Sequence, residues 1–213
     1  MEPIATVLTG DLIASTQAGQ EAVDGAMAVL EAVASHEAQI SGLDVRFARF
    51  RGDGWQMYCP DAARVFRLTV LVLANLHSRP ALAQTRVAVA VGSVSVLPQS
   101  GLASASGEVF TTSGRELDNM TTDHLTYFSQ TPDAKWQRPL FGYLAWQSSR
   151  WSPQQAEAIA MTFSYNPPAP RKSAEELGIS RQAFSARLDG AGYVPLWDAN
   201  RAFNPSDRFA PND

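Results

Sequence analysis

The order in which strand-like and helix-like segments follow one another constrains this chain most. Short runs rich in β-branched and aromatic residues predict strands, and apolar residues that recur every three or four positions predict helices. The order is strand, helix, strand, strand, helix, strand, which is typical of the ferredoxin-like βαββαβ arrangement in the α+β class. The segments are residues 4–8, 21–40, 45–50, 55–58, 61–77 and 86–91.

The remaining sequence predicts a second, smaller unit. From residue 152 the sequence pattern changes and predicts short polar helices, separated by an Asn-Pro-Pro step at residues 166–168 and by Gly178. We therefore expect one domain over residues 1–150 and a small all-α module over residues 151–213. Before that boundary we expect a helix over 107–120, a strand over 125–128 and an aromatic-rich helix over 135–151.

Bulk properties exclude several classes of protein. The 213 residues are 45% hydrophobic and 18% charged, which is ordinary globular usage. The net charge of −4 offers no general attraction to nucleic acid or anionic lipid, so any such binding must be local. Residues 65–76 are too few to span a bilayer, and no signal peptide is recognised. We expect a cytoplasmic protein without a membrane partner, whose single Cys59 is a buried, unpaired thiol.

Two aspartates end strand-like segments that the expected topology brings together. Asp11 follows the first strand and Asp53 lies at the hairpin tip. In a βαββαβ sheet these positions meet at one rim, where two like charges need a cation. A pair of Mg²⁺ or Mn²⁺ ions would bind both the carboxylate oxygens and the phosphates of a substrate. Gly10, Gly52 and Gly54 would leave the backbone open to a triphosphate. Turn geometry and helix capping are the alternative explanation for each acid.

Four segments resemble the class III nucleotidyl cyclases, and more closely the small cyclase-like proteins of the SatD type that carry a helix-turn-helix. TGDLIAST at residues 9–16 resembles the first metal motif of the family, and FRGDG at 50–54 resembles the second. RVAVAVG at 86–92 resembles the strand that follows. GEVFTTSGR at 107–115 resembles the helix that carries the transition-state residues, so the likeness covers roughly residues 4–120.

The resemblance assigns roles to matching positions. It implies that Asp11 and Asp53, with Leu12 beside them, form the metal site, and that Arg115 stabilises the transferring phosphate as a catalytic residue. Thr111 stands where the family has the catalytic asparagine that orients the ribose. For Arg115 the alternative is a surface ion pair with a neighbouring acid on the same helix.

Base recognition is not fixed by the resemblance. Arg49 replaces the lysine of adenine-selecting members, and Ser104 stands where those members carry an acid. Both are nucleotide-binding candidates, yet the base of the nucleoside triphosphate stays open. The family shares its active site across a head-to-tail homodimer, with metals held by one subunit and the arginine supplied by the other. The resemblance therefore implies a homodimer here.

The C-terminal string AEELGISRQAFSARLDGAGY resembles the helix-turn-helix segments of bacterial regulators. Double-stranded DNA would meet the start of the last helix at its base edges and nearby cations at its phosphates. Basic and acidic side chains balance over residues 152–201, so packing or dimerisation is an alternative role for this module. The DNA-binding candidates are Lys172, Ser180, Arg181, Gln182, Ser185 and Arg187.

Three functions are compatible with these features. The first is a nucleotide-responsive, DNA-binding transcription regulator with a cyclase-like metal-nucleotide site, which we favour slightly because Asp11, Asp53 and Arg115 are present while the ribose- and base-reading positions differ. The second is an active cyclase that makes a 3′,5′-cyclic nucleotide and pyrophosphate. The third is a catalytically inert interaction protein. Cyclic product formation separates the second from the others, and duplex binding separates the first.

Overall fold

A five-stranded mixed sheet forms the centre of the molecule. The computed structural model describes residues 2–50, 52–121, 124–131, 134–164 and 167–205. The strand order is β2-β3-β1-β4-β5. β1 pairs antiparallel with β3 and β4, β2 pairs antiparallel with β3, and β5 pairs parallel with β4. The strands are β1 (Ile4–Leu12), β2 (Arg46–Phe50), β3 (Gly54–Cys59), β4 (Thr85–Ser93) and β5 (Leu125–Ser129).

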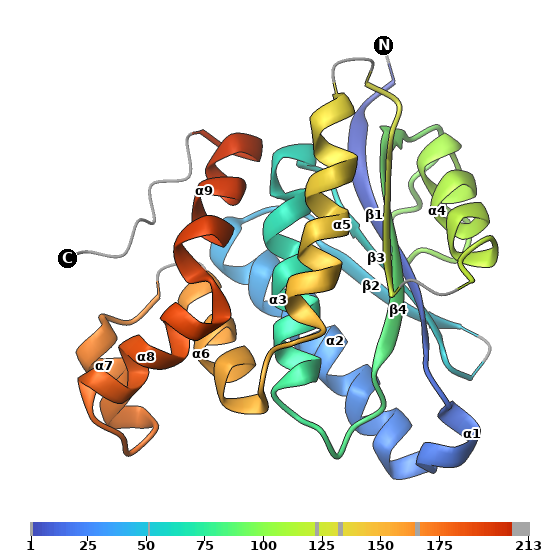
Figure 1. Cartoon of the computed structure of the whole chain (residues 1–213). Coiled ribbons are helices and arrows are strands. Elements are labelled where there is room, and N and C mark those ends of the chain that lie inside the picture. Colours follow the sequence, from blue (N-terminus) through green and yellow to red (C-terminus); the bar gives the residue numbers. More distant parts are fainter. Residues whose placement is uncertain (1, 51, 122–123, 132–133, 165–166, 206–213) are drawn as a thin grey trace.

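Helices cover both faces of this sheet (Figure 1). Side chains alternate along β1, and the buried clusters show which residues face which layer of helices. Leu8 and Leu12 belong to the main buried cluster, which includes α2 (Gln20–Ser41), α3 (Val65–His77) and α5 (Gln137–Ser148). Ala5 and Val7 pack in a second cluster with α4 (Glu108–Asp118). Since neighbouring strand residues point to opposite faces, Thr9 and Asp11 belong to the α4 side.

Short helical turns complete the first part of the chain. The four-residue α1 (Ser15–Ala18) follows β1 at the rim, η1 (Ala62–Arg64) leads into α3, and η2 (Ala134–Trp136) leads into α5. These turns break two of the predicted helices, over 61–77 and 135–151, into a 3₁₀ turn followed by an α-helix. The other predicted elements are present, and the α+β class is confirmed.

The C-terminal helices pack onto the sheet layer through α3. They are α6 (Pro153–Phe163), α7 (Pro170–Glu176), α8 (Arg181–Ala191) and α9 (Tyr193–Phe203). α6 begins with a capping box, in which Ser152 accepts from the Gln155 amide and Gln155 accepts from Ser152. The Phe203 ring stacks on Phe66 of α3 with centroids 5.4 Å apart. One buried cluster therefore runs from the sheet into residues 151–197.

α9 is an element that the sequence pattern did not predict. Pro195 lies inside it, and proline usually ends a helix. Here it stands in the first turn, where its missing N–H removes no helical hydrogen bond. Gly192, with φ of 74°, makes the left-handed turn between α8 and α9.

Two bulk expectations can be compared with the structure. Cys59 is fully buried at the end of β3, as predicted, and burial raises the pKa of its thiol to about 12. No helix in the described part of the chain is both long and apolar enough to cross a bilayer.

Because the cluster is shared, a cavity made in α6 should destabilise the whole chain in one step. Ile159 in α6 is fully buried, and Ile159→Ala should cost about 2–4 kcal/mol of unfolding free energy. The matched control is Val194→Ala in α9, whose side chain is 63% exposed and which should change stability by less than about 0.5 kcal/mol. Urea unfolding followed by circular dichroism and by tryptophan fluorescence should give coincident curves in both variants. Separate transitions would contradict a shared core.

Candidate functional site

Strand pairing brings the two aspartates to one rim of the sheet. Asp11 lies opposite Gly54 in the β1–β3 register, and the Leu12 amide donates to the Asp53 carbonyl over 3.1 Å. With this register the Cα atoms of Asp11 and Asp53 are about 6 Å apart by strand geometry. Asp11 near the end of β1 and Asp53 in the turn just before β3 therefore lie at the same rim, as the order of elements predicts. The rim is where β1 runs into α1 and β2 turns into β3 (Figure 1).

Asp11 already has a cation, and it is an arginine that the sequence reasoning missed. Arg86 is the second residue of the apolar strand β4 and lies opposite Asp11. Its Nε donates to Asp11 Oδ1 over 2.9 Å, and its Nη2 donates to Oδ2. The two side chains are 34% and 29% exposed, and the pair raises the pKa of Arg86. The available signal was a lone arginine in a β-branched run that pairs antiparallel with the strand of Asp11.

Asp53 is oriented by a second residue that was overlooked. Ser15 Oγ donates to Asp53 Oδ2 over 2.6 Å from the start of α1. Ala14, just before it, has φ of 52° and is the one non-glycine residue with a left-handed backbone in the described ranges. An L-residue in this conformation costs roughly 1–2 kcal/mol. The turn between β1 and α1 therefore holds strained backbone while it presents Ser15 to Asp53.

The three glycines of the site have packing and turn roles. A Cβ on Gly10 would lie 2.5 Å from the Trp55 ring and 2.6 Å from the Arg86 carbonyl. A Cβ on Gly54 would lie 2.9 Å from the Phe50 carbonyl. Gly52 has φ of 82°, which the hairpin tip requires. The space beside Gly10 is thus filled by Trp55 instead of standing open to a ligand.

The residues at the rim fit a divalent cation, with one condition. Asp11 and Asp53 offer hard oxygen donors at one rim of the sheet, the donor type that Mg²⁺ and Mn²⁺ take. Across the described residues no group of three or more His, Cys, Asp or Glu side chains could hold a metal, so phosphates and water would have to complete the shell. Leu12 has a buried side chain, so only its carbonyl could take part. The condition is that Arg86 gives up an oxygen of Asp11.

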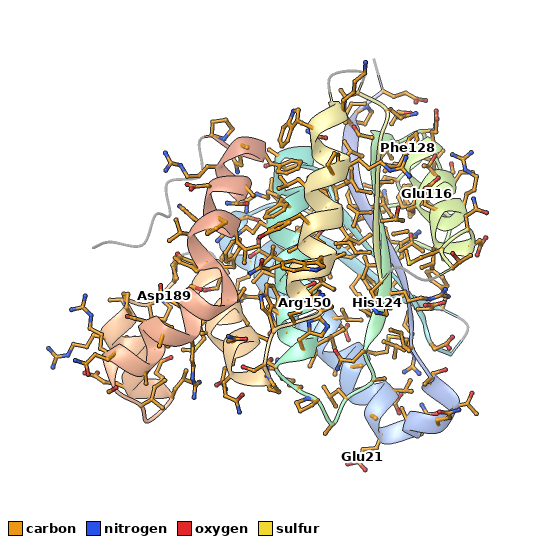
Figure 2. All side chains as sticks on the ribbon, in the orientation of Figure 1. Glu21, Glu116, His124, Phe128, Arg150 and Asp189 are labelled. Carbon is orange, nitrogen blue, oxygen red and sulfur yellow. The ribbon has the colours of Figure 1, made fainter. Side chains whose placement is uncertain are left out.

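The two catalytic candidates on α4 share a stripe that faces away from the sheet. Thr111 and Arg115 are exposed, and they lie one helical turn apart. The buried side of α4 carries Ser113, whose hydroxyl is 2.7 Å from Thr9 Oγ1 on β1. The Arg115 side chain is 58% exposed, and its Nε is 4.0 Å from Glu116 of the same helix. Figure 2 labels Glu116 on this outer layer.

The two base-reading candidates lie away from the aspartates. Arg49 projects from the opposite face of the sheet, where it donates to Asp24 of α2 over 2.7 Å and lowers the pKa of that carboxyl. Ser104 is exposed in the loop before α4, beyond the Ser93 end of β4. That end is the far end of β4 from Arg86, roughly 25 Å away by strand rise. A single chain therefore brings neither residue to Asp11.

The C-terminal candidates divide into free and paired side chains. Ser180 caps α8 by accepting from the Ala183 amide, so its hydroxyl has a structural role. Arg181 and Gln182 are exposed in the first turn of α8, and Ser185 is half-buried one turn later. The cations are partly paired: Arg187 donates to Glu157 of α6 over 2.9 Å, and Lys172 lies 4.0 Å from Glu176. Asp189 of α8 lies on the opposite side of the molecule from Glu116 of α4 (Figure 2).

Comparisons with known proteins gave structural neighbours only. No family model matches the sequence, and no curated protein matches it. The structure is similar to that of the guanylyl cyclase Cya2, at 18% identity and a TM-score of 0.40, over 57% of this chain and 74% of that one. It is also similar to a bacterial light-regulated adenylyl cyclase, at 15% identity and a TM-score of 0.42, over 60% of this chain and 76% of that one.

Relief of the strain before Ser15 should stabilise the protein. Ala14→Gly places glycine in a left-handed turn and should add about 1 kcal/mol to the unfolding free energy. The matched control is Ala28→Gly, at an exposed position inside α2, which should remove about 1 kcal/mol. Thermal melting would measure both. Equal losses in the two variants would contradict a left-handed backbone at residue 14.

Proposed function

We propose that this chain binds a nucleoside triphosphate with Mg²⁺ or Mn²⁺ at Asp11 and Asp53, as a class III nucleotidyl cyclase-like protein of ferredoxin-like topology. One observation supports the proposal: the β1–β3 register brings the backbones of two acids from distant parts of the sequence together at one rim of the sheet. Like charges at one rim repel each other. Their joint presence favours a role in binding cations and phosphates over a purely structural one.

The residues of the rim support this chemistry by position. Bound divalent ions would neutralise the triphosphate and polarise its transferring phosphate. Asp11 and Asp53 would supply oxygen ligands on backbone fixed by strand pairing, so little ordering is needed when the ions bind. Ser15 would hold the Asp53 carboxylate in one orientation through its 2.6 Å hydrogen bond. The strained turn at Ala14 keeps that serine in place.

A homodimer would complete the site. Arg115 and Thr111 lie on the outer stripe of α4, away from the sheet that carries the aspartates. An exposed guanidinium on that stripe is free to reach phosphates held by a second copy of the chain. The aspartates of one subunit and the arginine of the other then form one catalytic unit, in which the arginine stabilises negative charge that grows on the phosphate.

Activity should depend on both aspartates. Incubation with Mn²⁺ and each of the four ribonucleoside triphosphates should release a 3′,5′-cyclic nucleotide and pyrophosphate from at least one of them. Asp11→Asn and Asp53→Asn should lower the rate by about 100-fold or more, because each removes an ionised ligand. The control is Asp44→Asn, which removes the charge of an acid paired with Arg46 on the surface and should leave the rate unchanged. Chromatography of the products gives the rates.

Mixing two inactive variants would test the shared site. Arg115→Ala and Asp11→Asn subunits should each be inactive alone. After random reassociation about half of the dimers are mixed, and each mixed dimer regains one intact site of two, so about a quarter of the activity should return. If the unmodified protein forms product but the mixture of the two variants regains no activity, the head-to-tail dimer is contradicted. Absence of product from all four triphosphates, with metal-dependent nucleotide binding retained, would leave a binding protein instead of an enzyme.

A second candidate function is DNA binding by α7 and α8. The observation that favours it is the exposed pair Arg181 and Gln182 in the first turn of α8, directly after the turn formed at Gly178. These side chains suit guanine and adenine edges in the major groove. The balanced charge of the module and the Arg187–Glu157 ion pair argue for weaker phosphate binding than in a strongly basic domain. In a regulator, nucleotide bound at the rim would bias this module.

Selection from a random duplex library would test this candidate. Arg181→Ala and Gln182→Ala should weaken binding of the selected duplex by about 5- to 100-fold and relax its sequence preference. The control is Arg201→Ala in α9, an exposed arginine outside α7 and α8, which should leave affinity within about twofold. Fluorescence anisotropy at two salt concentrations gives the affinities. Failure to enrich any duplex would remove DNA binding as a function.

A further inference from the structure

Arg86 occupies the position that a cation must reach at this site. Both oxygens of the Asp11 carboxylate accept hydrogen bonds from its guanidinium, through Nε at 2.9 Å and through Nη2. A bidentate arginine uses the in-plane lone pairs that a metal ion also needs. The carboxylate has about four lone pairs, and a metal that takes the inner pair facing Arg86 has to displace the arginine. Of the two aspartates, only Asp11 has a cationic partner among the ion pairs of the described residues.

Groups at the end of α4 could hold the Arg86 guanidinium after it leaves Asp11. Its third nitrogen, Nη1, donates to the Met120 carbonyl over 3.1 Å, just beyond the end of α4. That hydrogen bond does not involve Asp11 and can survive its loss. Asp118, the last residue of α4, also interacts electrostatically with the guanidinium. The side chain is 34% exposed, so a small rotation toward α4 does not bury an unpaired charge.

We infer that Arg86 is a resident counter-cation that divalent metal must displace from Asp11, so that the arginine sets the metal affinity of the site. This inference rests on the proposed metal site at Asp11 and Asp53. In the metal-free protein the guanidinium neutralises the Asp11 carboxylate at the rim. When metal binds, the Asp11–Arg86 pair is exchanged for a metal–carboxylate bond, and Arg86 keeps its bond to Met120 beside Asp118. Metal binding and the contact between β4 and α4 are thereby linked.

The exchange predicts opposite effects of losing Arg86 on stability and on metal affinity, which an ion pair with a purely structural role would not produce. Loss of Arg86 should lower the stability of the metal-free protein, because the Asp11 carboxylate would then lose its cationic partner. The same loss should raise metal affinity, since no bond to the arginine has to be broken first. A partly exposed ion pair of this kind is worth up to about 1 kcal/mol, which corresponds to roughly fivefold in affinity.

The experiment measures Mn²⁺ alone, without nucleotide. Free Mn²⁺ is followed by electron paramagnetic resonance during titration of the full chain at fixed ionic strength. Arg86→Gln should bind Mn²⁺ up to about fivefold more tightly than the unmodified protein, and Arg86→Lys, which keeps the charge but loses the bidentate fork, should lie between them. The matched control is Arg79→Gln, which removes an exposed arginine that hydrogen-bonds to neighbouring Asn75 and Ser78 and should change affinity by less than twofold.

The outcomes separate this inference from the proposed function. The gain should vanish in the double variant Asp11→Asn with Arg86→Gln, and Mn²⁺ should raise the melting temperature of Arg86→Gln more than that of the unmodified protein. Equal affinities in the Arg86 variants and the unmodified protein, with binding still lost in Asp11→Asn, would overturn the counter-cation while the metal site stood. Absence of Asp11-dependent Mn²⁺ binding in every variant would instead overturn the proposed metal site. If Arg86→Gln does not fold, Arg86→Lys decides by the same comparison.

Discussion

Pairing of β1 with strands on both sides is the constraint on which the site depends. β1 lies at the centre of the sheet, so Asp11 has Gly54 on one side and Arg86 on the other. The first pairing brings Asp53 close, and the second brings a cation. Neither neighbour is close in sequence, and both positions follow from backbone hydrogen bonds that every residue type except proline can make. The pairing of the central strand β1 thus fixes the relative positions of the residues at the rim.

Much of the fold and part of the site followed from the sequence. Periodicity of apolar residues gave the order of strands and helices, and the Asp-Gly turn identified the hairpin, so the adjacency of Asp11 and Asp53 could be predicted. Arg86 and Ser15 could not be found in the same way. Their contacts with the aspartates depend on the register of β4 against β1 and on a left-handed turn at Ala14, which no local pattern announces.

The position of Arg49 shows how narrowly such predictions can miss. Side chains alternate along a strand, so a residue at a matching motif position faces the site only if the parity of the register is also right. Arg49 shares the face of Phe47, whose ring stacks on Trp55 in the layer of α2 and α3. Asp11 belongs to the other face. Arg49 therefore pairs with Asp24 because its position in the alternation places it on the α2 side of the sheet. The spacing of a motif does not determine that side.

The shared core restricts how the two ends of the molecule could communicate. Residues 151–197 add their buried side chains to the cluster that already contains α3, and Arg187 of α8 is tied to Glu157 of α6. A module joined by a free linker could respond to a partner independently of the sheet, but this one would have to move together with α6 and α3. Coupling between sites requires an element with two arrangements of similar energy. If metal displaces Arg86 from Asp11 as inferred above, the Arg86 contact between β4 and the end of α4 would be such an element near the rim, whereas the packed α3–α6 interface resists small displacements. A signal that starts at Asp11 would thus act first on α4 and on whatever packs against its outer stripe, before it could reach α8.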